Sequence, residues 1–332
     1  MNRSGLPARV CKLQLHHMIV ALLMSMALLL AACSADDTPA VATSDDEDAL
    51  GIAVASFDIA VGDNRRLLAG VYTATRELVA FGEVTFRLGF VAPDSGGDVT
   101  LDQQVTAAWL PVAGMAPDGD DTQPRLLAGE PGSGVYQARV QLDQPGTWAL
   151  QVEAQLQNGT TRIGTAVFNV QPETLIPTIG DPAQSVDNWT IADAQAGRVD
   201  PVAVDSRAQG DDATIPAPHL HDVTVSEALD AGRPIVITIA TPVYCVSRFC
   251  GPLTDVMAEL ALEYADVAEF IHIEVWENFD EQQLNEAAAA WIQTDLGGNE
   301  PWVFVVDGTG HIQARWDNVL DVDELERQLA QL

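Results

Sequence analysis

The sequence predicts two folded parts of different class, an all-β sandwich followed by a domain in which strands alternate with helices. Residues 50–171 hold short runs of alternating apolar residues separated by Gly/Pro turns, which is typical of antiparallel strands. Residues 219–332 hold continuous apolar runs between amphipathic helical segments, which is typical of strands covered on both faces. With 332 residues, of which 47% are hydrophobic and 19% charged, the chain is long enough for two cores.

The β part contains clear strand and turn patterns. Residues 83–91, EVTFRLGFV, place Val84, Phe86 and Leu88 on one face, and residues 134–142 repeat the alternation less strictly. Asn158-Gly159 lies between two further alternating runs and predicts a hairpin. The rhythm of GVYQARVQLDQPGTWALQVEAQ resembles small extracytoplasmic Ig-like modules. The resemblance implies an Ig-like β-sandwich over residues 50–171.

A long linker is predicted over residues 172–218. This segment has six prolines, scattered acidic residues and no sustained apolar period. We expect it to pack on its neighbours in part, through Ile176, Ile179 and Trp189.

The C-terminal part predicts the element order βαβαββα after one short helix. The short helix, residues 224–232, is closed by Gly232. Strands are expected over residues 234–240, 269–276 and, around Asp307-Gly308, 301–316; helices are expected over residues 252–266, 280–297 and 321–332. Asp280 with Gln283, and Asp321 with Glu324, have the spacing of capping boxes. The order predicts an α/β sheet with parallel strands first and a hairpin last.

The N-terminus is typical of an export signal. Arg3, Arg9 and Lys12 precede an apolar run over residues 18–32, which is short for a spanning helix. The run ends in LAAC, residues 30–33, which resembles the lipobox of bacterial lipoproteins. The resemblance implies a signal peptide over residues 1–32, lipid on Cys33, and a membrane-anchored protein outside the cytoplasm, periplasmic or on the outer surface. Residues 33–49 are small and acidic and predict a tether.

The charge excludes one class of partner. Sixteen Lys and Arg residues oppose 48 Asp and Glu residues, giving a net charge of −32. Nucleic-acid binding requires a basic face, so no nucleic-acid partner is expected.

Cys245 and Cys250 are the two cysteines left to pair, because Cys11 lies in the predicted signal peptide and Cys33 would carry lipid. In a regular helix, residues five apart have Cα atoms roughly 8–9 Å apart, whereas a disulfide needs about 4.4–6.8 Å. We therefore expect Cys245 on the loop after a strand and Cys250 near the start of the next helix. A helix N-terminus lowers the pKa of a nearby thiol. We assign Cys245 as the attacking thiol and Cys250 as the resolving one; the reverse assignment remains open because Gly-Pro follows Cys250.

This placement resembles the thioredoxin fold. The resemblance lies in two stretches, PIVITIATPVYCVSRFCGPLTD and EPWVFVVDGTG, with CGP at residues 250–252 and Pro301 at the start of a strand. The resemblance implies a thioredoxin-like domain over residues 219–332, a cis Pro301 beside the disulfide, and thiol-disulfide exchange with an envelope protein. Tyr244 stands where the family has a tryptophan, and no buried acid occupies the strand. These departures leave open whether the protein is an enzyme.

Two other functions use the same cysteines. Two thiolates and an imidazole would suit Cu(I), with His272 or His311 as the third ligand, in copper handling for oxidase assembly. The pair His219 and His221 is expected to lie at the domain edge without metal. In the third alternative, the disulfide is structural and the protein is a binding module. Thiol-disulfide exchange needs no cofactor.

Overall fold

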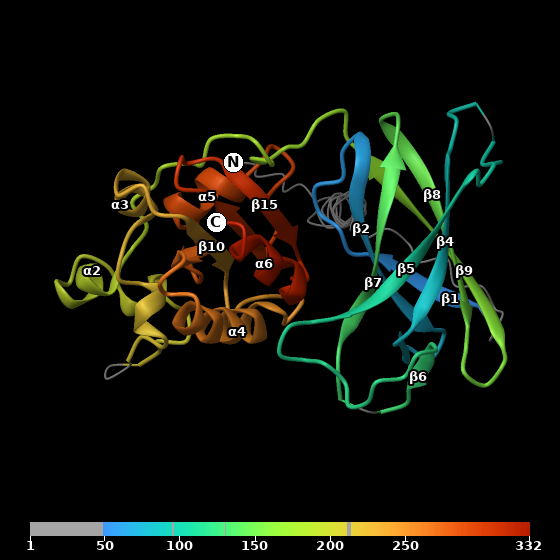
Figure 1. The fold of residues 1–332 in the computed structure, drawn as a ribbon, viewed down its shortest axis with the longest axis horizontal. Helices are drawn as coiled ribbons and strands as arrows, with labels where there is room; N and C mark the ends of the chain where they lie inside the picture. The colour runs from blue at the N-terminus through green and yellow to red at the C-terminus, as the bar shows by residue number, and fades with distance from the viewer. Residues whose placement is uncertain (1–48, 95, 130, 211–213) are drawn as a thin grey trace, which may run out of the picture. The chain divides into compact units, whose positions relative to one another are not determined.

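The computed structural model describes residues 49–332, except Ser95, Glu130 and residues 211–213 (Figure 1). The predicted signal peptide, the lipid on Cys33 and the tether up to residue 48 lie outside these residues. All described residues belong to one compact unit.

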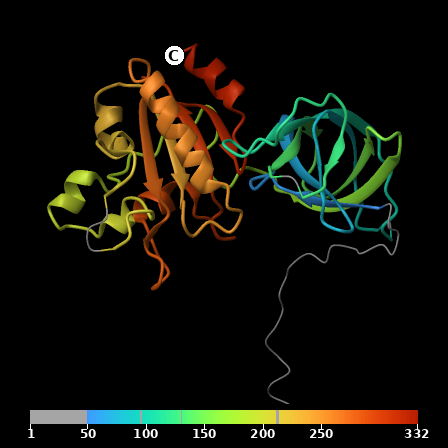
Figure 2. The same ribbon diagram turned by 90° about the horizontal axis from the view of Figure 1, so that it is seen from below.

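The first half of the described chain contains nine strands. They are β1 (Leu50–Val54), β2 (Gly62–Thr73), β3 (Leu78–Ala80), β4 (Glu83–Phe90), β5 (Gln103–Pro111), β6 (Arg125–Leu127), β7 (Gly134–Leu142), β8 (Gly146–Gln155) and β9 (Thr161–Val170). Their order is β1-β9-β8-β4-β5-β7-β2-β3-β6, and β1 also pairs with β2. The second pairing of β1 closes seven strands into a barrel, which Figure 2 shows around a common interior. Short β3 and β6 extend the sheet beyond β2.

Alternating residues fill the barrel interior. Phe86 and Leu88 of β4, and Leu150 and Val152 of β8, are fully buried. Phe86 lies opposite Val152 in the register of the two strands. The structure confirms the strands predicted over residues 83–91 and 134–142 and the hairpin predicted at Asn158-Gly159.

The predicted Ig-like sandwich is wrong, because one sheet closes on itself where two packed sheets were expected. Leu50 pairs with Thr73 of β2 on one side and Gly164 of β9 on the other. Alternation identifies which residues face a core, and it is the same for a sandwich and for a barrel. Strand β1 pairs on both sides, and the sequence of its five residues alone does not predict this double pairing.

The predicted linker contains α2 (Ile191–Gln195) and the 3₁₀ turn η1 (Pro201–Ala203), and a second 3₁₀ turn, η2 (Pro218–Leu220), begins at its last residue. Thr190 caps α2 in a capping box with Asp193. Ile176 is buried in a core and Trp189 packs on a small cluster, whereas Ile179 is exposed.

The second half contains a four-stranded sheet and short helices. The elements are α3 (Val225–Asp230), β10 (Ile235–Ala240), α4 (Cys250–Glu263), β11 (Glu269–Glu274), β12 (Trp276–Asn278), β13 (Gln283–Leu284), α5 (Glu286–Ile292), β14 (Trp302–Val306), β15 (Ile312–Asp317) and α6 (Val322–Leu329). The sheet order is β11-β10-β14-β15. Strands β10 and β11 are parallel, and β14 is antiparallel to β10 and to β15. Every residue of β10 is buried.

The predicted α/β thioredoxin-like class is also wrong. The described chain is mostly β, and its five α-helices are short, with only α4 longer than eight residues. The largest difference is the helix predicted over residues 280–297. Gln283–Leu284 pair with Trp276–Asn278 as β13 and β12, so the helix begins only after Asn285, whose side chain caps it. The expected capping box at Asp280 is therefore absent.

Candidate functional site

Cys245 and Cys250 form a disulfide with Cα atoms 6.1 Å apart. Strand β10 ends at Ala240, the intervening loop carries Cys245, and α4 begins at Cys250. The loop is compact because Cys245 N donates to Thr241 O at 3.1 Å and Arg248 N donates to Cys245 O at 3.2 Å. The structure thus brings the two predicted site cysteines together at the start of a helix.

The two sulfur-bearing residues differ in exposure. Cys245 is 8% exposed and Cys250 is fully buried. Ser247 Oγ lies 3.2 Å from Cys245 Sγ, and the neighbouring Val246 is 95% exposed. A partner that reaches this disulfide therefore meets Cys245 first.

Cys250 is the first residue of α4, where backbone N–H groups lack partners within the helix. Phe249 precedes it and provides no side-chain cap. The positive end of the helix dipole stabilises a thiolate and lowers the pKa of a thiol placed there. The start of α4 therefore places Cys250 where the helix terminus favours an anion, while its complete burial acts in the opposite direction.

Pro301 precedes β14, is buried, and follows a cis peptide bond from Glu300. Strands β10 and β14 pair with Ile239 opposite Trp302. The next residues along this antiparallel register are Ala240 and Pro301, and Ala240 packs with both cysteines. Pro301 thus lies at the sheet end from which the cysteine loop leaves.

The candidate copper histidines lie in different surroundings. His311 is exposed and bonds Thr309 in the turn between β14 and β15. His272 is buried in β11, where its Nε2 lies 3.0 Å from Ala240 O. His219 is half-buried with Nε2 2.9 Å from Ala258 O.

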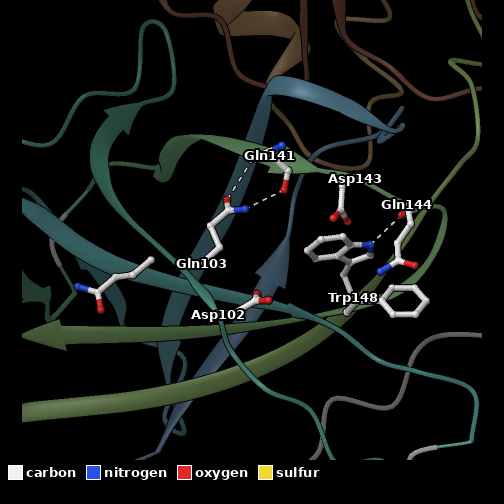
Figure 3. A pocket seen from close by; sticks show the side chains of 8 residues that line it. Asp102, Gln103, Gln141, Asp143, Gln144 and Trp148 are labelled. Atoms are coloured by element: carbon white, nitrogen blue, oxygen red, sulfur yellow. Dashed lines mark hydrogen bonds between the residues drawn. The ribbon is translucent and has the colours of Figure 1, made fainter.

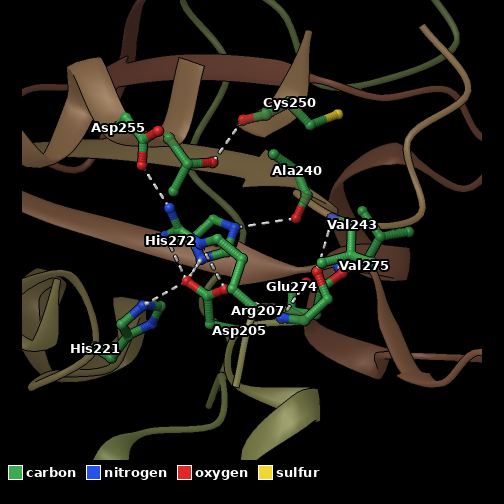
Figure 4. Close-up of polar contacts among 12 residues, drawn as sticks. Asp205, Arg207, His221, Ala240, Val243, Cys250, Asp255, His272, Glu274 and Val275 are labelled. Atoms are coloured by element: carbon green, nitrogen blue, oxygen red, sulfur yellow. Dashed lines mark hydrogen bonds and ion pairs between the residues drawn. The ribbon is translucent and has the colours of Figure 1, made fainter. Parts of the chain in front are cut away.

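His221, expected to lie at the domain edge without metal, is instead part of a buried cluster with Asp205 and His272 (Figure 4). All three side chains have no exposed surface. Asp205 Oδ2 lies 3.6 Å from His221 Nε2 and 3.9 Å from His272 Nδ1. Within residues 49–332 as described, this is the group that gathers three potential metal donors, and it contains neither cysteine.

Arg207 holds the carboxylate of Asp205. Its Nη2 donates to Asp205 Oδ2 at 2.7 Å and its Nε donates to Oδ1 at 3.0 Å. Burial acts to raise the pKa of Asp205, but contacts with His221 and Arg207 outweigh it and hold that pKa well below its ordinary value. Burial lowers the pKa of His272 to about 4. Asp205 is therefore a buried anion beside a neutral imidazole at neutral pH.

The segment around Asp205 hydrogen-bonds to the cysteine loop. Ser206 Oγ accepts from Val243 N at 3.1 Å, and Ser206 N donates to the buried Glu274 Oε2 at 2.9 Å. Burial raises the pKa of Glu274 to about 7. On the helix side, Arg207 Nη1 donates to Asp255 Oδ1 of α4 at 2.6 Å. Residues 205–207 thus connect to the loop that carries Cys245 and to the helix that carries Cys250.

Sequence reasoning missed Asp205, Arg207 and Glu274. Asp205 and Arg207 lie in the predicted linker, where no apolar period marks a packed segment. Two neighbouring signals were available, the histidines at positions 221 and 272, but nothing in the sequence connects them to residue 205.

A polar groove of about 480 Å³ lies on the barrel (Figure 3). It is lined by Phe90, Asp102, Gln103, Gln104, Gln141, Asp143, Gln144 and Trp148. The Gln103 side chain exchanges two hydrogen bonds with the Gln141 backbone, and Trp148 Nε1 donates to Gln144 O. These groups satisfy one another, and none of the candidate site residues lines this groove.

Across the part of the chain that is described, no helix is both long and apolar enough to cross a membrane. The chain matches no protein-family model, no curated protein and no solved structure.

Proposed function

We propose that the protein exchanges disulfides with another protein through Cys245 and Cys250. The observation that carries the proposal is the pairing of these cysteines between a loop and a helix N-terminus, with Cys245 slightly exposed, at 8%, and Cys250 fully buried. A disulfide that only staples a fold has no need of a helix terminus that stabilises its thiolate.

The exchange takes place in two steps that balance. A thiolate of the partner attacks Cys245 Sγ, a mixed disulfide forms, and Cys250 leaves as a thiolate at the start of α4. The partner's second thiolate then attacks its own sulfur in the mixed disulfide and releases Cys245. In total the partner dithiol loses two electrons and two protons, and the Cys245–Cys250 pair gains them. The reverse sequence, with Cys245 as nucleophile, oxidises the protein and reduces a partner disulfide.

We propose an envelope location for this exchange. The lipobox-like LAAC ending at Cys33 supports it. The Cys245–Cys250 disulfide also supports it, because disulfides persist outside the cytoplasm. Replacing Cys33 with Ser in cells should move the protein from the membrane fraction to the soluble fraction, while Cys11→Ser should not. Retention of the Cys33→Ser protein in washed membranes would contradict the lipid anchor.

Trapping of the mixed disulfide tests the exchange. A Cys250→Ser variant keeps the more exposed thiol and lacks the resolving one, so it should accumulate an adduct with oxidised glutathione. The matched Cys245→Ser variant keeps only the buried thiol and should form the adduct at least about tenfold more slowly. Mass spectrometry of acid-quenched samples measures both rates.

Two outcomes would contradict the proposal. Equal adduct formation by both variants would mean that exposure does not select Cys245. Resistance of the native disulfide to a dithiol until the protein unfolds would show that the bond is structural. Tight Cu(I) binding by the reduced protein, lost in either variant, would instead favour copper handling by the same thiols.

A further inference from the structure

We propose that Asp205, His221 and His272 bind a divalent metal ion of the zinc class. One carboxylate oxygen and two imidazole nitrogens lie within 4.8 Å of one another in a fully buried cluster. The site shares no residue with the proposed disulfide exchange, so each can fail without the other.

The ring of His272 is turned so that a lone pair faces Asp205. Its Nε2 lies 3.0 Å from Ala240 O, and a backbone carbonyl only accepts, so Nε2 carries a hydrogen. In the neutral ring, Nδ1 then presents a lone pair, and it has no hydrogen-bond partner among the described residues. It faces the Asp205 carboxylate at 3.9 Å. Two acceptors that face each other away from water repel unless a cation lies between them.

The hydrogen bond from His272 to a backbone carbonyl is also typical of metal-binding histidines. Metal-binding histidines usually donate their other ring N–H to a carbonyl or carboxylate, which fixes the tautomer and the ring orientation. The contact with Ala240 O has this form and leaves Nδ1 as the free ligand atom.

His221 is an independent observation that points to a ligand. Its side chain has no exposed surface, yet Nδ1 has no hydrogen-bond partner among the described residues and Nε2 has only a long contact with Asp205. Its Nε2 lies 3.6 Å from Asp205 Oδ2, and its ring centroid is 5.2 Å from that of His272. Buried polar atoms normally have partners, and a metal ion would provide one for both histidines at once.

The spacing and the donor types fit a small divalent ion. Tetrahedral zinc with bonds of about 2.0–2.2 Å holds its ligand atoms roughly 3.3 Å apart. The separations of 3.6 and 3.9 Å from Asp205 Oδ2 would have to close by about 0.3 and 0.6 Å, and that between the two histidine nitrogens, which lie within 4.8 Å, by up to about 1.5 Å. Two imidazoles with one carboxylate suit zinc and its first-row neighbours, whereas Mg²⁺ and Ca²⁺ prefer oxygen ligands.

Arg207 fits this site as a group that orients the carboxylate. It bonds both oxygens of Asp205 and also Asp255. Two carboxylates therefore surround one guanidinium, and the local charge is negative before a cation enters. Hydrogen bonds that orient a ligating carboxylate are common around metal ions.

Loading of the full chain with Zn²⁺ or Co²⁺, with the disulfide kept oxidised, tests the site. Because the cluster is buried, the protein is refolded with and without one equivalent of metal and then desalted. We expect one Zn²⁺ per chain by elemental analysis and a melting temperature several degrees above that of the EDTA-treated protein. Co²⁺ should give the visible bands of a tetrahedral nitrogen and oxygen site without a thiolate charge-transfer band. The double variant Cys245→Ser/Cys250→Ser should bind equally.

Matched variants locate the ion. Asp205→Asn and His272→Gln should weaken Zn²⁺ binding at least about 100-fold, while His219→Gln and His311→Gln, outside the cluster, should leave it unchanged. If the cluster variants do not fold, the Co²⁺ spectrum of the unchanged protein still shows whether nitrogen and oxygen ligands, without a thiolate, hold the ion. Refolded protein without bound Zn²⁺ or Co²⁺, or binding retained by Asp205→Asn, would overturn the proposal; a proton shared by Asp205 and His221 would then account for their contact.

Discussion

Arg66 of β2 and Asp317 of β15 form a largely buried ion pair. Arg66 Nη1 lies 2.9 Å from Asp317 Oδ1, and the two side chains are 8% and 11% exposed. Asp317 Oδ2 also accepts from Phe57 N at 2.6 Å. A buried pair of this kind adds little over an apolar pair, but the loss of one partner leaves an uncompensated charge.

Asp317→Asn should therefore destabilise the protein by about 3 kcal/mol, measured as the free energy of unfolding in urea. The control is Glu153→Gln, which breaks the exposed pair with Arg87, whose side chains are 39% and 32% exposed. That change should cost less than about 1 kcal/mol. Equal losses in the two variants would show that burial does not determine the strength of the Arg66 pair.

Ser206 is the residue that connects the buried polar segment to the cysteine loop. In Ser206→Ala, Val243 N loses its acceptor, which should lower the free energy of unfolding by about 1 kcal/mol. The loosened loop should also let a dithiol reduce the disulfide several-fold faster. The control, Ser226→Ala, removes a hydroxyl bonded to the exposed Asp187 and should leave the reduction rate unchanged. An unchanged rate in Ser206→Ala would mean that this contact does not control access to the sulfurs.

Part of the candidate site could be predicted from the sequence. The helix rise and the disulfide span together place Cys245 on a loop and Cys250 at a helix start, and this is what the structure has. Asp205 was not predictable, because its partners lie 16 and 67 positions away in the chain, as the residue numbers 221 and 272 show. Contacts over such separations depend on the path of the whole chain between them.

Among the secondary-structure elements, strands β1 and β9 meet with the fewest paired residues in the barrel. The two strands share one paired position, Leu50 with Gly164. A Cβ on Gly164 would overlap the Leu50 carbonyl oxygen and lie 2.8 Å from Leu50 Cβ and 2.9 Å from Ile52 Cγ1. The strands can meet here because residue 164 has no side chain.

Gly164→Ala should force these strands apart and lower the free energy of unfolding by about 1–3 kcal/mol. Gly51→Ala in β1 is the matched control, because its Cβ would meet only Tyr72 O, at 3.8 Å. Urea unfolding followed by tryptophan fluorescence measures both variants. If the two variants lose the same stability, the barrel does not depend on close contact between β1 and β9.

Most elements could be predicted, while some of their boundaries could not. Strand β10 coincides with its apolar run, and α3 is capped at Thr224 and followed by Gly232 with φ of 65°. Asp321 caps α6 as expected, but the Glu324 carboxylate accepts from Trp316 Nε1 and does not complete a capping box. A side chain with a tertiary partner available can leave the local motif that its spacing suggests.

At the scale of the whole molecule, the fold class could not be predicted. Alternation in the β part was the correct signal for strands, yet the class depends on whether the outer strands pair with each other. Strand pairing also explains why a helix of the second half is shorter than predicted. Local periodicity over residues 280–297 indicates a helix, and pairing of β12 with β13 removes its first turns. Long-range pairing outweighs local preference in both places.

Residues of the β part and of the second half are in direct contact. Leu68 of β2 packs with Val112, Val135 and Val319 in one cluster, and Asn318 Nδ2 donates to Ala55 O at 2.9 Å. The hydrogen bond joins residues 263 positions apart, and the cluster brings Val319 together with residues at least 184 positions earlier in the chain, within one compact unit. Effects of substitutions in the β part on the stability of the cysteine region are therefore expected.

The reduction potential of the Cys245–Cys250 pair distinguishes thiol-disulfide exchange from a structural disulfide. Folded protein is equilibrated with glutathione buffers of graded ratio at pH 7, quenched with acid, alkylated and weighed by mass spectrometry, while circular dichroism follows the fold. Thiol-disulfide exchange predicts reversible opening in the folded state with a potential of roughly −120 to −270 mV, the range of exchanging dithiols. A potential below about −300 mV, or reduction only together with unfolding, would contradict it and make the disulfide a structural one.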